Sequence, residues 1–202
     1  MDARSRWRLA LPGTWHGIPV HDVAAARRAV KALVAERFKG IDDAPKIRRD
    51  LEESLQAQAE RAREANGLSL ALCTELVPGI ALGASLLVTY TASSGVDLME
   101  LQAGLLTSPG IAEAGHRDLN GHPALRLART TIADPENAPD LISLNVDHYI
   151  PDPEAAGFYG VLLSAPLPEP LLESTAEFFD AMASTFHLVD DYQGHQHQEG
   201  AA

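Results

Sequence analysis

The dipeptide Asn120-Gly121 lies between two runs of largely alternating residues, 111–119 and 122–132. Asn-Gly supplies the two positive φ angles of a two-residue hairpin turn, so the runs should pair as antiparallel strands. A turn of this length also sets the register, and it places His116 opposite Leu125. The chain therefore contains at least one antiparallel hairpin, which narrows the folds open to it.

The two-residue period recurs elsewhere and predicts further strands. They are expected at 68–77, 81–92, 141–150 and 157–165. Pro78-Gly79 should join the first two as a hairpin. The run 157–165 is apolar on both faces, so we expect it at the centre of the sheet, where both faces are covered.

Apolar residues at three- and four-residue spacing predict two helices in the first third of the chain. Asp22 can cap the first, which should end by Gly40. The second should begin at Asp42 or Asp43, and Gly67 is placed to stop it. Together they make a helical segment over residues 22–66.

Two more helices are expected later in the chain, over 98–106 and 171–186. The last has a broad apolar face, which includes Phe178 and Phe179 and should cover the sheet. Its opposite side is lined by acidic residues, namely Glu169, Glu173, Glu177 and Asp180.

The second helix has an apolar stripe only one residue wide. It consists of Ile47, Leu51, Leu55, Ala59 and Ala62, and it fades to alanine toward the C-terminal end. We expect the first half to pack and the second half to be stabilised poorly by its own chain. A partner protein, or a second copy of the chain, is then predicted to contact Leu55, Ala59 and Ala62. The alternative is a helix that lies flat on the sandwich with its charged face in water.

Composition excludes several classes of protein. The 202 residues fit one domain, and the single cysteine, Cys73, excludes an internal disulfide framework and a cysteine-based zinc site. No apolar run reaches the roughly 18 residues that a membrane span needs, and no secretory signal is recognisable. We therefore expect a cytoplasmic protein without membrane insertion.

Charge is distributed unevenly along the chain. Residues 1–66 hold thirteen of the sixteen Lys and Arg but only ten of the twenty-eight Asp and Glu. Beyond them the only basic residues are Arg117, Arg126 and Arg129, too few for a continuous basic groove, which argues against a nucleic-acid partner. The favoured interpretation is that the basic first third lies against the acidic remainder, rather than forming a docking face.

Three stretches resemble the PsbP/Mog superfamily. The hairpin 118–126, Asp-Leu-Asn-Gly-His-Pro-Ala-Leu-Arg, is similar to one common in that family. The segment 159–166, followed by Phe178-Phe179 and 182–186, resembles its penultimate strand, closing helix and Ser-Phe signature. The opening Leu9-Ala10-Leu11-Pro12 with Trp15 is similar to its usual start. The resemblance covers about 130 residues.

This resemblance implies an α+β fold, with a largely antiparallel sheet in an α/β/α sandwich. It also implies a non-enzymatic role, because members of the superfamily brace a photosystem, bind a small nuclear GTPase, form actinobacterial lipoproteins or chaperone secretion-system effectors. The helical segment 22–66 has no required counterpart in that family. The signal and lipidated cysteine of the lipoproteins are also absent here.

Two histidines on predicted strands suggest an alternative to protein binding. His116 and His148 lie on the apolar sides of their strands and could approach each other across the sheet, forming a small-molecule or hydrolytic pocket. Such a site needs a third ligand or an orienting carboxylate, and Asp147 faces away from His148 by strand alternation. Histidines of the core or its rim are the favoured interpretation.

Other reactive residues lack the context that catalysis requires. Ser94, Ser164 and Ser184 stand outside a Gly-x-Ser-x-Gly motif, and Cys73 has no basic neighbour in sequence to activate it. Trp15 is expected in the core, whereas Trp7, between Arg6 and Arg8, could anchor a partner.

The sequence thus predicts one sandwich domain over residues 1–191 and a disordered tail over 192–202, whose His195 and His197 are expected to be solvated. It predicts no catalytic residue, metal or cofactor. The predicted function is a cytoplasmic adaptor or chaperone that binds another protein, in a secretion system or another multiprotein assembly, with a homo-oligomer also open.

Overall fold

The computed structural model describes residues 6–41, 44–76, 83–93, 97–107, 111–134 and 138–189. The helices are α1 (Val23–Arg37), α2 (Pro45–Glu64), α3 (Leu98–Leu106), the 3₁₀ turn η2 (Glu169–Leu171) and α4 (Leu172–Ala183). The strands are β1 (Trp7–Arg8), β2 (His16–Ile18), β3 (Gly67–Cys73), β4 (Ala84–Ala92), β5 (Ile111–Leu119), β6 (His122–Asp134), β7 (Ala138–Pro151), β8 (Gly157–Leu167) and β9 (His187–Leu188).

Seven of these strands form one antiparallel sheet in the order β2-β3-β4-β8-β7-β6-β5, and β1 pairs separately with β9. The α+β fold with a largely antiparallel sheet, predicted from the sequence, is confirmed. The strand β8 lies fourth of seven, so its predicted central position is also confirmed.

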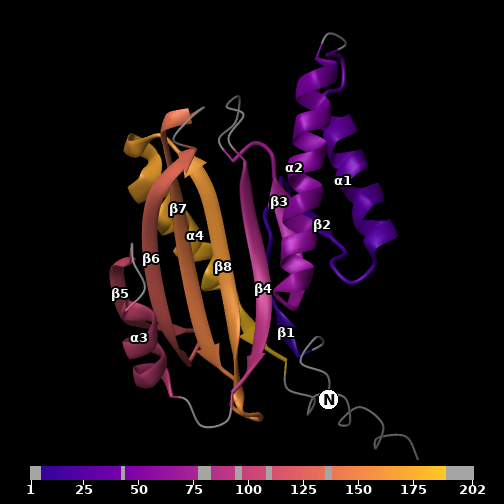
Figure 1. Ribbon diagram of the computed structural model, residues 1–202. Helices are drawn as coiled ribbons and strands as arrows, with labels where there is room; N and C mark the ends of the chain where they lie inside the picture. The colour runs from indigo at the N-terminus through magenta and orange to yellow at the C-terminus, as the bar shows by residue number, and fades with distance from the viewer. Residues whose placement is uncertain are drawn as a thin grey trace, which may run out of the picture.

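The helices cover the two faces of this sheet unequally (Figure 1). Helix α4 packs on one face, where it shares a core with β4, β7 and β8. The α1–α2 pair lies on the other face over β2 and β3, and α3 lies on that same face beside β5 and β6. The middle of this second face therefore lies between two separate groups of helices, and we call it the open face.

The Asn120-Gly121 hairpin forms as predicted. The φ angles of Asn120 and Gly121 are 54° and 83°, and His116 pairs with Leu125. The Asn120 amide Nδ2 donates to the carbonyl oxygens of Ser184 at 2.6 Å and Phe186 at 3.1 Å. The turn thus also binds the residues that follow α4, a contact that the Asn-Gly pattern alone did not predict.

Helices α1 and α3 agree with their predicted bounds, whereas α2 and α4 end earlier than predicted. The Asp22 carboxylate caps α1 by accepting from the Ala25 amide at 2.9 Å. Asp42 and Asp43 lie outside the described residues. At the other end, α2 stops at Glu64, before Gly67, and Asn66 adopts a left-handed conformation with φ 53°. Gly67 instead starts β3, where a Cβ atom would lie 2.7 Å from the Ala62 carbonyl oxygen.

Packing along α2 is the reverse of the prediction. Leu55, Ala59 and Ala62 are 7%, 7% and 3% exposed, in a core shared with α1 and β3, whereas Ile47 is 63% exposed. The chain passes from α2 directly into β3, so only the C-terminal half of this 20-residue helix is held over the sheet. Leu55, Ala59 and Ala62 therefore contact their own chain, and their predicted contact with a partner is corrected.

Helix α4 differs from its prediction at two positions. Phe178, expected in the apolar face, is 37% exposed. Asp180, expected on the solvent side, is hydrogen-bonded to residues of the sheet. No described helix combines the length and apolar character needed to span a bilayer. The predicted tail over 192–202 lies outside the described residues.

Candidate functional site

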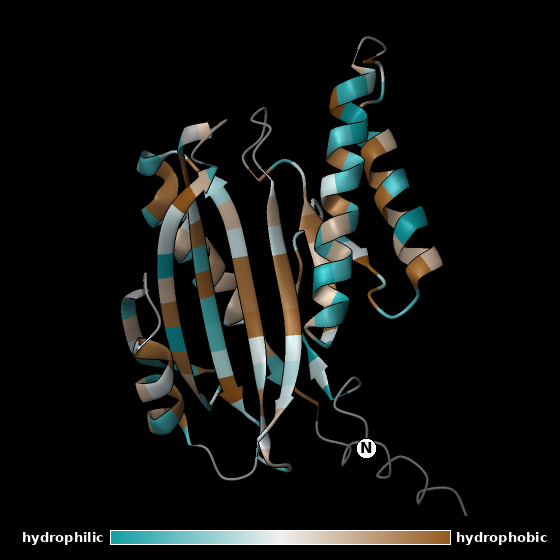
Figure 2. Ribbon diagram, viewed as in Figure 1, coloured by the Kyte–Doolittle hydropathy of each residue, from teal (hydrophilic) through white to brown (hydrophobic). Residues whose placement is uncertain are grey.

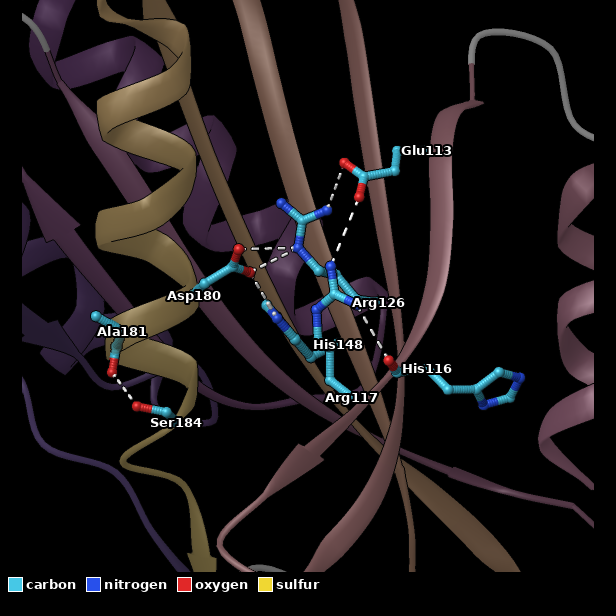
Figure 3. Close-up of polar contacts among 8 residues, drawn as sticks. All are labelled: Glu113, His116, Arg117, Arg126, His148, Asp180, Ala181 and Ser184. Carbon is cyan, nitrogen blue, oxygen red and sulfur yellow. Dashed lines mark hydrogen bonds and ion pairs between the residues drawn. The ribbon is translucent and has the colours of Figure 1, made fainter.

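A cluster of charged side chains lies between α4 and the strands β5, β6 and β7 (Figure 3). Arg126 and His148 are paired positions on β6 and β7, so their side chains leave the sheet on the same face. Asp180 on α4 and Glu113 on β5 both point toward Arg126. These four side chains form what we call the α4 brace.

The Asp180 carboxylate is the hub of the α4 brace. It accepts hydrogen bonds from Nε of Arg126 at 2.7 and 2.9 Å, and its Oδ1 lies 3.0 Å from Nε2 of His148. Arg126 also donates from Nη1 to Glu113 at 3.0 Å. Arg126 and His148 are 5% and 1% exposed, so the Asp180 carboxylate contacts both of them in a largely buried environment.

Electrostatics favour the ionised form of Asp180. Partial burial by itself would raise the pKa of Asp180, but hydrogen bonds from His148 and Arg126 outweigh it and hold the pKa below its ordinary value. Burial would likewise lower the pKa of Arg126, and Asp180 and Glu113 hold it above its ordinary value instead. Asp180 and Arg126 therefore stay charged at neutral pH.

The orientation of His148 limits the chemistry of the α4 brace. A carboxylate only accepts hydrogen bonds, so the Asp180 contact assigns a proton to Nε2. Nδ1 is buried without a hydrogen-bond partner in the described part of the chain. Ser184 has the hydroxyl group nearest to Asp180 in sequence and is therefore the first candidate for a nucleophile. Its hydroxyl donates instead to the Ala181 carbonyl oxygen at 2.7 Å. The described contacts thus provide an Asp–His pair without a nucleophile hydrogen-bonded to it.

His116 lies on the other side of the sheet. Its register partner Leu125 pairs in turn with Tyr149, so His116 shares a face with Tyr149 and not with His148. Its Nε2 lies 2.9 Å from Oε1 of Gln102 on α3, and Figure 3 shows the ring directed away from the α4 brace. The prediction that His116 and His148 could approach each other is wrong, because adjacent positions on a strand face opposite sides.

A second ion pair lies on the face that carries His116. Asp147, 4% exposed, accepts from Nη2 of Arg129 at 2.9 Å. Burial raises the pKa of Asp147 even though Arg129 opposes the shift, and burial together with Asp147 raises the pKa of Tyr149 to about 12. The sequence correctly predicted that Asp147 and His148 face opposite ways.

A third ion pair joins the N-terminal end of the described chain to the loop that follows β7. The Arg6 guanidinium donates to both carboxylate oxygens of Asp152, at 3.1 and 3.3 Å, and lies 2.8 Å from Glu154. Next to it, the Trp7 ring stacks on Phe186 with centroids 6.2 Å apart. Trp7 is thus half-buried against its own chain, and its predicted role as a partner anchor stays a prediction.

These ion pairs were missed by sequence reasoning. Arg126 lies in the apolar run Ala-Leu-Arg-Leu-Ala, and a charged residue at such a position signals a buried partner. The identity of that partner, 54 residues later on α4, left no such signal. No group of three or more His, Cys, Asp or Glu that could hold a metal ion is found within the ranges that the structure describes.

Helix α3 presents an unusual apolar surface. Its sequence is Leu-Met-Glu-Leu-Gln-Ala-Gly-Leu-Leu, yet none of its residues is buried. Met99 and Leu106 are 73% and 50% exposed. Figure 2 shows hydrophobic bands on this helix at the edge of the open face.

Comparisons with known proteins concern the fold. No protein-family model matches the chain, and no curated protein matches it. The solved structures that resemble it include those of two PsbP-like proteins, cyanobacterial PsbP and LpqN. The solution structure of cyanobacterial PsbP (CyanoP) from Synechocystis sp. PCC 6803 has 11% identity and a TM-score of 0.46, and the match covers 93% of this chain and 89% of that one.

The second structure is that of LpqN of Mycobacterium tuberculosis, a protein described as involved in cell envelope biogenesis. The match has 11% identity and a TM-score of 0.48, and it covers 91% of this chain and 83% of that one. Both likenesses thus have low identity and a TM-score below 0.5. At this level they concern the course of the chain and carry no residue role.

Proposed function

We propose that the chain is a non-enzymatic adaptor or chaperone that binds another protein through α3. The observation that carries this proposal is the exposure of Met99 and Leu106 on a helix with no buried residue. A helix that is apolar around its circumference is normally buried, and a contiguous apolar patch left exposed is typical of a protein-binding surface. The partner would present an apolar patch of its own.

The α4 brace supports a structural rather than a catalytic role for the buried charges. Arg126, His148 and Asp180 are bonded to one another and tie α4 to the sheet. A hydrolytic site would need an additional group poised at His148, and an acid–base pair of histidines would need both rings on one face. The alternative of a pocket between His116 and His148 loses its geometric basis, because the two lie on opposite faces.

The cytoplasm is the compartment that the sequence predicts for this adaptor, and a multiprotein assembly is its proposed setting. A second copy of the chain is one form that the partner could take. The basic residues Arg27, Arg28 and Lys31 of α1 are solvent-exposed, and the proposed contact through α3 does not involve them.

The double variant Met99→Glu/Leu106→Glu tests the proposal. Proteins that co-purify in fixed stoichiometry with the wild-type chain should be lost from this variant and retained by Val23→Glu. Val23 is also apolar and 38% exposed, but it lies on α1 over the opposite part of the sheet. Light scattering of the chain alone shows whether the partner is a second copy. An identical set of bound proteins in both variants would refute binding through α3.

A further inference from the structure

An apolar groove separates the first half of α2 from the sheet. It has a volume of about 490 Å³, and its walls include Ile47, Leu51 and Leu55 on α2 and Ala84 and Pro166 at the ends of β4 and β8. Small-ligand sites usually have volumes of roughly 300–1,000 Å³ and predominantly apolar walls. The groove is separate from α3, which lies at the other side of the open face (Figure 1).

The groove exists because α2 is longer than the part of the sheet beneath it. Leu55, Ala59 and Ala62 hold the C-terminal half of α2 in the core, and the N-terminal half continues past the point where β3 ends. Ile47 and Ile41 consequently remain 63% and 47% exposed at the groove. Large aliphatic side chains at a groove gain free energy when an apolar chain covers them.

Arg37 is the charged residue in the described wall of the groove. Its Nη1 lies 3.8 Å from the Glu75 carboxylate, well beyond the roughly 2.7–2.9 Å of a strong charge-assisted hydrogen bond, and its side chain is 30% exposed. The guanidinium carries five donors, so it can accommodate a further carboxylate. The rest of the polar lining includes the amide of Gln58 and the hydroxyl groups of Ser54, Thr74, Ser85 and Ser164.

We propose that this groove binds one free long-chain fatty acid, with the alkyl chain between α2 and the sheet and the carboxylate at Arg37. The apolar walls account for the chain, and the single cation accounts for the acidic head group. This binding activity is independent of the protein contact proposed for α3, because the two surfaces share no residue.

Calorimetric titration of the purified full chain with decanoate, laurate and myristate, each kept as monomers, tests the proposal. Binding should be one to one, and each added pair of methylenes should tighten it by about tenfold while the groove fills. Dodecyltrimethylammonium has the alkyl length of laurate with a cationic head, and it should bind at least about tenfold more weakly. Arg37→Gln should abolish that difference, and the exposed control Arg28→Gln should keep it.

Two variants test the place of binding. Ile47→Glu puts a charge at an exposed position of the apolar wall, and Ser54→Trp fills the groove from an exposed position on α2. Each should weaken myristate binding by about tenfold or more, with the cooperative thermal melt retained as the check on folding. The controls Val23→Glu and Met99→Glu/Leu106→Glu should bind myristate like the wild type.

Several results would overturn the fatty-acid site. They are no binding of monomeric myristate, equal binding of the cationic amphiphile, equal affinity in Ile47→Glu and Ser54→Trp, or association with phospholipid vesicles alone. A loss of myristate binding in the α3 variant would show that the two surfaces are not independent. Failure of protein capture through α3, with myristate binding intact, would refute only the adaptor proposal.

Discussion

Asp180 of α4 lies 3.0 Å from Nε2 of His148, and the same carboxylate bonds Nε of Arg126 at 2.7 Å. One acidic side chain on the helix therefore satisfies two basic side chains on adjacent strands. Because Arg126 and His148 are buried, removal of the carboxylate would leave both without their common partner. The position of α4 on the sheet thus depends on charge as well as on its apolar face.

Asp180→Asn should lower the free energy of unfolding by about 1–2 kcal/mol at neutral pH. The folded state holds the pKa of Asp180 below its ordinary value of 3.8. Its contribution is therefore present above that value and is lost as the pH falls through the lower folded pKa. Urea unfolding of both proteins should show the difference shrinking in acid, and a pH-independent difference would contradict the ionic role.

Asp147→Asn should behave in the opposite sense. Burial raises the pKa of Asp147 in the folded state, so the wild type binds this proton more tightly when folded than when unfolded. The wild type should then lose stability relative to Asp147→Asn as the pH rises through the raised pKa. Unfolding free energies of both proteins measured at a series of pH values test this sign. A relative gain for the wild type with rising pH would contradict it.

Asp152→Ala should destabilise the chain by about 3 kcal/mol or more. The Asp152 side chain is fully buried and accepts both hydrogen bonds from Arg6, which is itself buried. Its removal leaves the buried guanidinium next to the carboxylate of Glu154, which is largely in solvent. Glu154→Ala is the matched control, because Glu154 contacts the same guanidinium but is 60% exposed. Thermal melts should separate the two variants clearly, and equal melting temperatures would show that Arg6 does not need Asp152.

Local chemistry made much of the fold predictable. The Asn-Gly turn, the Asp22 cap and the doubly apolar run that became β8 each specify their own conformation. Which half of α2 packs on the sheet depends instead on where the chain enters β3. A stripe of alanines in the sequence does not show whether that part of the helix is weakly packed or in close contact with the sheet. Asp180 was misplaced for a related reason, since an acidic residue near a helix face shows no sign of the arginine that it meets.

Gly121→Val should lower stability by more than about 1 kcal/mol. Gly121 has a φ of 83°, a conformation that a β-branched residue strongly disfavours. Gly104 is the control, because it is exposed in α3 with nothing within 4 Å of an added Cβ atom. Gly104→Ala should be neutral or stabilising. An unchanged melting temperature in Gly121→Val would mean that the turn is not held in this conformation.

Ala59→Glu/Ala62→Glu tests the revised packing of α2. Both alanines are almost fully buried against the chain itself, so two carboxylates there would be desolvated and sterically crowded. We expect loss of the cooperative melt, and not the selective loss of association that a partner surface at these residues would give. Ser54→Glu adds a charge at an exposed position of the same helix and should melt like the wild type. A folded double variant that loses only a partner would restore Ala59 and Ala62 as an interface and would refute the close contact between α2 and β3.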